Sequence, residues 1–178
     1  MRILAVLVSL TLLAGLPAHA ADFKDGTVAL TFETKAIAKA VTEGGNSRGP
    51  ALALLKDDTV LLGGGRSGGE ILTWNKAKTG LRSLGNFIPT NRRQDDSRFA
   101  INDIAVLSES AKSAKLLISY PRFGVDKSCV EIAIDELNYD RKKQRVKFVR
   151  NWFVTQPCVP VSAVQHTAGR FEVIDKNS

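Results

Sequence analysis

The sequence contains few of the residues from which catalytic and metal sites are usually built. Its 178 residues include only two cysteines, two histidines and one methionine. No Cys-x-x-Cys pair is present, and His19 lies in an N-terminal segment that we expect to be removed. We therefore expect no metal site built from these residues. His166 is the one imidazole left as a candidate acid or base.

Long hydrophobic runs are confined to the N-terminus. Arg2 precedes the apolar run Ile3–Leu16, and the small-x-small pattern Ala18-His19-Ala20 follows it. This arrangement is typical of a secretory signal peptide, here residues 1–20, and the run is shorter than the ~18 residues of a membrane span. We expect residues 21–178 to form a periplasmic or secreted protein without a transmembrane segment.

Both cysteines, Cys129 and Cys158, lie in the segment 21–178. An even cysteine count in an exported chain permits a disulfide, and we expect these two to pair, with two buried free thiols as the alternative. A disulfide between Cys129 and Cys158 would close a loop of about 30 residues and would stabilise the fold by about 3 kcal/mol.

The charge is unbalanced, with a formal net charge of +7. The densest basic stretch, 141–147 (Arg-Lys-Lys-Gln-Arg-Val-Lys), stands where a turn between two apolar segments is expected, and it lacks interleaved aromatic residues for base stacking. We interpret it as a solvated hairpin tip and expect no nucleic-acid partner. Contact with anionic envelope polymers is the alternative.

Short alternating segments separated by turn residues predict an all-β fold with no sustained helix. The expected strands are Val28–Phe32, Ala51–Leu55, Thr59–Leu62, Glu70–Trp74, Leu81–Leu84, Asp103–Val106, Lys115–Tyr120, Cys129–Leu137, Arg145–Phe153 and Gly169–Ile174.

These strands fall into sets of four joined by tight turns, which is how the blades of a β-propeller are built. One set occupies 51–84, a second occupies 103–153, and a third begins at Gly169. We expect the N-terminal portion of a propeller, about two blades plus the start of a third, with Val28–Phe32 completing the last blade. A small β-sandwich is the alternative.

Three stretches resemble soluble pyrroloquinoline quinone-dependent sugar (aldose) dehydrogenases, the glucose/sorbosone dehydrogenase-like six-bladed propellers. Residues 51–75 (ALALLKDDTVLLGGGRSGGEILTWN) look like the first blade, and residues 101–122 (INDIAVLSESAKSAKLLISYPR) are similar to the second. Residues 165–178 (QHTAGRFEVIDKNS) resemble the His-x-x-Gly-Arg segment that enters the third.

The resemblance implies that His166 is the general base in the oxidation of an aldose at its anomeric carbon to a lactone. Pyrroloquinoline quinone and calcium would be the cofactors, with ligands mostly beyond residue 178, so we expect this chain by itself to be inactive. The partners implied are a sugar and an electron acceptor. The alternative function is a non-catalytic extracytoplasmic propeller that binds a cell-envelope partner or polymer.

The sequence departs from the family pattern at residues 97–103. Arg98 stands where many members carry a glutamine that is used toward the sugar, and Phe99 replaces a glycine. We expect these changes to narrow the mouth of the pocket or to alter the substrate.

The signal-peptide prediction has a direct test. We expect exported material to begin near Ala21, because the Ala18-His19-Ala20 pattern is typical of signal-peptidase cleavage. N-terminal sequencing of the secreted or periplasmic fraction measures this. A cytosolic pool that retains Met1 would contradict it.

Overall fold

The computed structural model describes residues 20–24, 29–33, 51–64, 68–75, 77–92, 98–125, 127–166 and 169–174. The chain divides into two compact units, Met1–Ala36 and Ile37–Ser178. In the first unit, β1 (Ala20–Lys24) pairs antiparallel with β2 (Ala29–Glu33). The strand expected at Val28–Phe32 is therefore present, but its described partner is β1 and not a strand of another blade.

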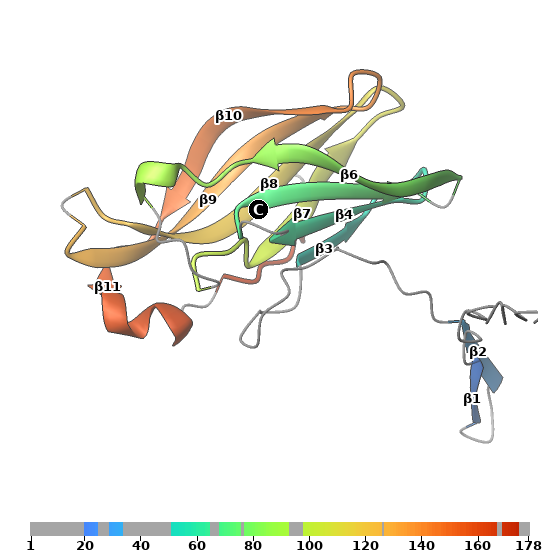
Figure 1. The fold of residues 1–178 in the computed structure, drawn as a ribbon, viewed down its shortest axis with the longest axis horizontal. Helices are drawn as coiled ribbons and strands as arrows, with labels where there is room; N and C mark the ends of the chain where they lie inside the picture. The colour runs from blue at the N-terminus through green and yellow to red at the C-terminus, as the bar shows by residue number, and fades with distance from the viewer. Residues whose placement is uncertain are drawn as a thin grey trace, which may run out of the picture. The chain divides into compact units, whose positions relative to one another are not determined.

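The second unit contains a four-stranded and a five-stranded antiparallel sheet (Figure 1). The first sheet has the order β3-β4-β5-β6, and the second has the order β7-β8-β9-β10, with β11 pairing the start of β9. Their bounds are β3 Ala51–Leu54, β4 Thr59–Gly64, β5 Glu70–Asn75, β6 Lys78–Asn86, β7 Asp103–Glu109, β8 Ser113–Phe123, β9 Cys129–Asp140, β10 Arg145–Val154 and β11 Val159–Pro160.

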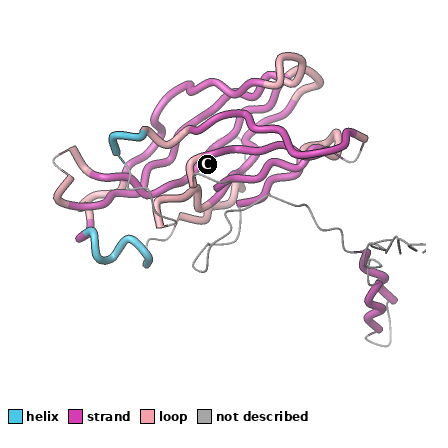
Figure 2. The backbone as a smooth tube through the Cα atoms, viewed as in Figure 1, coloured by secondary structure: helices cyan, strands magenta, loops and turns pink. Residues whose placement is uncertain are grey.

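Two short 3-10 helices, η1 (Thr90–Arg92) and η2 (Val161–His166), are the only helical segments among the described residues (Figure 2). Within this part of the chain no helix has the length and apolar character of a membrane span. The all-β prediction is confirmed. All eight strands expected between residues 51 and 153 are present, grouped into the two expected sets of four.

Local turn chemistry explains why consecutive strands pair. Between β3 and β4, Asp58 adopts a positive φ of 61°, and the Asp57 carboxylate accepts a hydrogen bond from the Thr59 amide at 3.2 Å. Asp tolerates the left-handed conformation and caps its own turn in this way. Between β9 and β10, Gln144 adopts a φ of 50° and donates its side-chain amide to the Arg141 carbonyl at 2.7 Å.

The two sheets pack face to face, and β3 contacts β7 while β6 contacts β10. Strand residues alternate between faces, so every second side chain enters the layer between the sheets. Buried apolar residues from both sheets fill this layer, including Leu61, Ile71, Leu116, Ile118 and Tyr139.

Gly63 is required for this packing because the backbone of β4 approaches the second sheet closely. A Cβ atom at Gly63 would lie 2.7 Å from Ile101 Cγ2 and 2.8 Å from Ile104 Cδ1. A side chain at this position would therefore push the two sheets apart.

The strand expected at Gly169–Ile174 is wrong, because the structure forms no ladder there. Its backbone is held by side chains instead, and Phe171 N donates to Asp103 Oδ2 at 3.0 Å. Alternating apolar residues make a strand only where a partner strand supplies hydrogen bonds. The third set of strands expected from Gly169 is therefore not present among the described residues.

Packing between the sheets predicts different costs for the same substitution at two leucines of the first sheet. Leu61 is 0 % exposed in the layer between the sheets, whereas Leu54 is 66 % exposed on the other face. We expect Leu61→Ala to lower the free energy of unfolding by about 2–5 kcal/mol and Leu54→Ala by less than about 1 kcal/mol. Urea unfolding of both variants measures this, and equal losses would contradict the assigned faces.

Candidate functional site

The segment that carries His166 is fastened to the second sheet by a disulfide. Cys129 at the start of β9 is bonded to Cys158, with 5.7 Å between their Cα atoms, so the expected pairing is present. Val159 and Pro160 then pair with Val130 and Cys129, and η2 follows directly. The disulfide therefore fixes the point from which η2 starts.

Phe99 belongs to a small apolar cluster that anchors η2. Its side chain is fully buried with Phe123, Val130 and Val164, and its ring centroid lies 4.8 Å from that of Phe123. The expectation that Phe99 narrows a pocket mouth is therefore wrong, because its ring is part of this packing. Sequence alone could not distinguish these roles, since Val164 and Phe123 are distant in the chain.

Beyond η2, the chain crosses the sheet at Gly169. A Cβ atom at Gly169 would lie 2.7 Å from Asn102 Nδ2 and 3.2 Å from Ser119 Oγ, so any other residue here would displace the Asn102 side chain. The Ser119 hydroxyl donates to the Gly169 carbonyl. Two of the stretches that carry the family resemblance therefore meet at this point.

Residues 51–75, the remaining stretch that carries the resemblance, reach the same region at Gly68. The Gly68 carbonyl accepts a hydrogen bond from Ile101 N at 2.9 Å, and Gly68 has a φ of +72° that an L side chain rarely adopts. A Cβ atom there would lie 2.7 Å from the Phe99 carbonyl oxygen. Glycine thus lets the first sheet contact the backbone that leads into β7.

His166 is the last residue of η2, and its side chain lies outside the described residues. The chain is fixed on both sides of it, by buried Val164 two residues before and by Gly169 three residues after. Arg98, the other residue implied by the resemblance, is half-buried just before Phe99.

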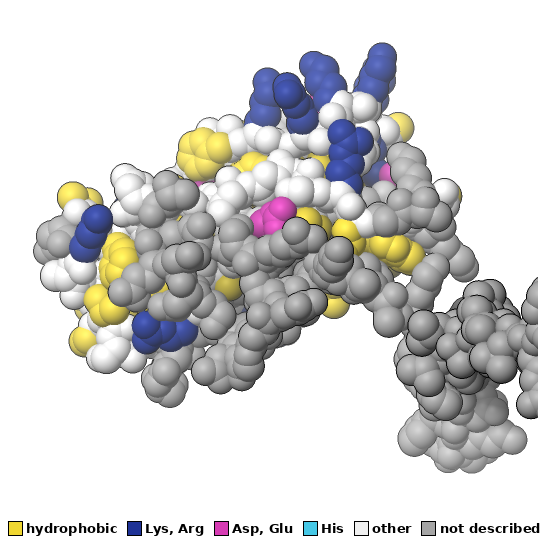
Figure 3. Space-filling model, in the orientation of Figure 1, with side chains coloured by type: hydrophobic (Ala, Val, Ile, Leu, Met, Phe, Trp, Pro, Cys, Tyr) yellow, Lys and Arg dark blue, Asp and Glu magenta, His cyan; other side chains and the backbone are white. Residues whose placement is uncertain are grey.

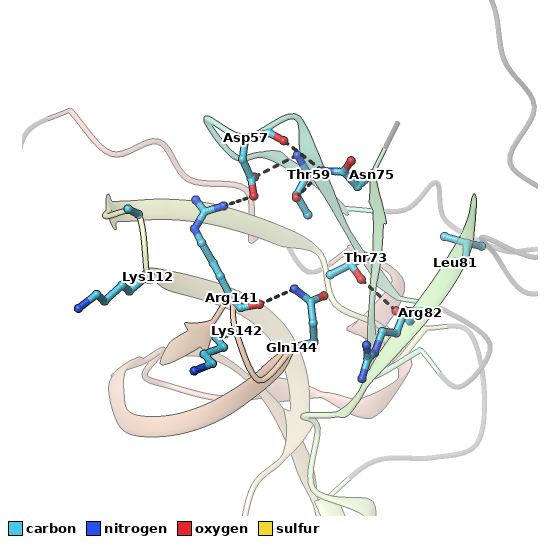
Figure 4. Close-up of a pocket in the computed structure, with 11 residues that line it drawn as sticks. Asp57, Thr59, Thr73, Asn75, Leu81, Arg82, Lys112, Arg141, Lys142 and Gln144 are labelled. Atoms are coloured by element: carbon cyan, nitrogen blue, oxygen red, sulfur yellow. Dashed lines mark hydrogen bonds and ion pairs between the residues drawn. The ribbon is translucent and has the colours of Figure 1, made fainter. Parts of the chain in front are cut away.

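A second polar constellation surrounds Arg141, at the end of the sheets where β9 turns into β10 (Figure 4). The Arg141 guanidinium binds Asp57 of the first sheet, with Nη1 to Oδ2 at 2.5 Å, and it also binds Glu109 at the end of β7. Glu109 in turn accepts Lys56 N at 2.9 Å. One arginine therefore joins turns of both sheets beside a pocket of about 510 Å³.

Burial and the neighbouring charges shift the pKa values of Asp57 and Arg141 in opposite directions. Burial would raise the pKa of Asp57, but the nearby Arg141 guanidinium and the hydrogen bonds from Thr59 outweigh it, and the pKa is lowered. Burial would likewise lower the pKa of Arg141, but Asp57 and Glu109 raise it. The Nη1–Asp57 contact is an ion pair without good hydrogen-bond direction, since Nη1 and Nε make no directed hydrogen bond among the described groups.

The basic stretch 141–147 forms the hairpin tip and the start of β10, as expected. Lys142 and Lys143 are exposed, and Figure 3 shows lysine and arginine side chains gathered over this hairpin. Arg141 differs from the predicted solvated tip because its side chain is buried by the two carboxylates.

The part of the chain that the structure describes contains no group of three or more His, Cys, Asp or Glu side chains arranged to hold a metal ion. No protein-family model matches this sequence, and no curated protein is significantly similar to it.

The Arg141 cluster predicts that replacing Arg141 lowers the free energy of unfolding much more than replacing the neighbouring Lys142. The side chains of Arg141 and Glu109 are 12 % and 7 % exposed, so Arg141→Met leaves a buried carboxylate without its cation. We expect a loss of about 3 kcal/mol in the free energy of unfolding, against less than about 0.5 kcal/mol for exposed Lys142→Met. Thermal and urea unfolding measure both, and a neutral Arg141→Met would show that the pair is dispensable.

Proposed function

We propose that the two sheets are consecutive blades of a β-propeller. Support comes from their order, since each sheet is an antiparallel meander of four strands and equivalent edges, β3 with β7 and β6 with β10, contact one another. Propeller blades stack in this way, each burying its faces against its neighbours. The exposed Leu52 and Leu54 lie on the face of the first sheet that the second sheet does not cover.

We further propose that the protein is an exported, quinone-dependent sugar dehydrogenase and that His166 is its general base. The observation that carries this proposal is the junction at Gly169, where the segment resembling the family's base segment is bound by Ser119 and Asp103. Both of these residues belong to the stretch that resembles the second blade. Residues distant in the sequence but similar to one family thus lie together.

The contribution of this chain would be a positioned proton acceptor. An imidazole in its neutral form can accept the proton of a sugar's anomeric hydroxyl. Its backbone is held by η2, by the disulfide and by Gly169, which limits the positions that the imidazole can take.

The cofactors implied by the resemblance are pyrroloquinoline quinone and calcium. When bound, pyrroloquinoline quinone would accept the hydride. The described residues bring no three His, Cys, Asp or Glu side chains together that could hold calcium. The role that we propose for this chain is that of the base alone.

An exported location is proposed on two grounds. The N-terminal pattern is that of a signal peptide, and the Cys129–Cys158 disulfide is typical of an oxidising compartment. Both fit a periplasmic or secreted protein.

Replacement of His166 tests the proposed role. In a full-length protein that carries this segment, we expect His166→Gln to reduce sugar-dependent dye reduction by about 10² to 10⁴, the usual cost of losing a general base, with quinone binding retained. Exposed Glu172→Gln on the same segment is the matched control and should keep parental turnover.

Near-parental turnover of His166→Gln with quinone bound would overturn the base assignment. A full-length protein that binds neither quinone nor calcium would instead support a non-catalytic propeller that binds a cell-envelope partner.

A further inference from the structure

A second pocket lies on the opposite face of the second sheet from the segment that carries His166. It has a volume of about 500 Å³ and is lined by residues 86–89, which follow β6, and by side chains of β8, β9 and β10. In Figure 1 the end of β6 leads toward η1 beside β10. Ser119 and Tyr120 are consecutive on β8, so Ser119 points toward Gly169 and Tyr120 toward this pocket.

An irregularity in β10 brings two side chains to the pocket that a regular strand would separate. Phe148 and Asn151 are three residues apart and would face opposite sides of a regular strand. The register shifts between Phe148 and Arg150, so that Phe148 pairs with Leu137 and Asn151 pairs with Asp135. Both therefore line the same pocket, and such bulges often redirect side chains beside functional sites.

A buried carboxylate orients the polar groups of the pocket. Asp135 accepts a hydrogen bond from the Tyr120 hydroxyl at 2.5 Å on one oxygen and from Asn151 Nδ2 at 2.7 Å on the other. Burial, and next the hydrogen bond to Asp135, raise the pKa of Tyr120, so its phenol stays a donor. With its Nδ2 facing Asp135, Asn151 presents Oδ1 as an acceptor that has no partner among the described residues.

Arg122 adds donors beside this acceptor. Its Nε donates to Glu131 at 2.7 Å, and Arg92 Nη2 binds the same Glu131 oxygen at 2.6 Å. The Arg122 guanidinium also interacts with the Tyr120 hydroxyl, and the residue lines the pocket. The charges of Arg92, Arg122, Glu131 and Asp135 sum to zero, so this region does not favour an anion.

The apolar part of the pocket includes Phe87 and Phe148, and Phe148 is 58 % exposed. A pocket of this size that combines aromatic rings with a few oriented donors and acceptors suits a small polar ligand that also has an apolar face. We infer that this pocket binds a neutral saccharide ring, with hydroxyls on Arg122 and Asn151 and C–H groups against Phe148. The site goes beyond the proposed base and requires no quinone.

The test uses the purified mature chain and a set of neutral probes, the methyl glycosides of glucose, galactose, mannose and N-acetylglucosamine. We expect at least one probe to shift the side-chain amide resonance of Asn151 in NMR titrations. Phe148→Ala should weaken its affinity by about ten-fold, a loss equivalent to one aromatic contact.

Phe153→Ala is the matched control. Phe153 is 53 % exposed on the same strand but pairs with Ile134, which places it on the opposite face, so its replacement should leave the affinity unchanged. Arg122→Lys is a second test, because lysine keeps a charge near Glu131 and removes the planar donors. His166→Gln should leave binding unchanged, which separates this site from the proposed base.

Failure of all four glycosides to bind would overturn the inference. Binding that survives both Phe148→Ala and Arg122→Lys would place the saccharide elsewhere and would also overturn it. Inorganic phosphate is the anion probe, and a shift of Asn151 with phosphate but with no glycoside would show an anion site instead.

Discussion

The contact between the two sheets is the constraint on which the other features depend. Gly63 allows the β4 backbone to approach Ile101 and Ile104, and the buried layer between the sheets fixes which face of each strand points inward. Because neighbouring residues of a strand face opposite sides, this choice assigns Ser119 to the segment that follows η2 and Tyr120 to the pocket on the other face. The packing of the two sheets therefore places the segment that follows η2 and this pocket on opposite faces of the second sheet.

Two clusters of buried polar side chains, one around Arg141 and one around Asp135, lie at different points along the sheets. Arg141 and Asp135 are six residues apart, about 20 Å along an extended chain, and each is buried with partners from other strands or turns. At the Arg141 end, the polar groups mainly bind one another and join the turns of both sheets. At the Asp135 end, hydrogen bonds to Asp135 and Glu131 orient Asn151 and Arg122, and both side chains line the pocket.

The sequence predicts the strands well and the sites poorly, for physical reasons. Alternation and turn residues identify all eight strands from 51 to 153, because these signals are local. The strand expected at 169–174 fails because a ladder needs a partner that local pattern does not supply. The meeting of Phe148 and Asn151 depends on a register shift, and the burial of Phe99 depends on η2, so neither could be found by spacing alone.

The disulfide has a further consequence for how the chain responds to proteolysis. The covalent ring closed by Cys129 and Cys158 contains the exposed Lys142 and Lys143, which are open to proteases that cleave after basic residues. A cut there breaks one peptide bond inside the ring, so both pieces stay covalently joined and the β9 ladder can hold β10 in place. This exposed basic turn thus lies where a nick cannot release a fragment.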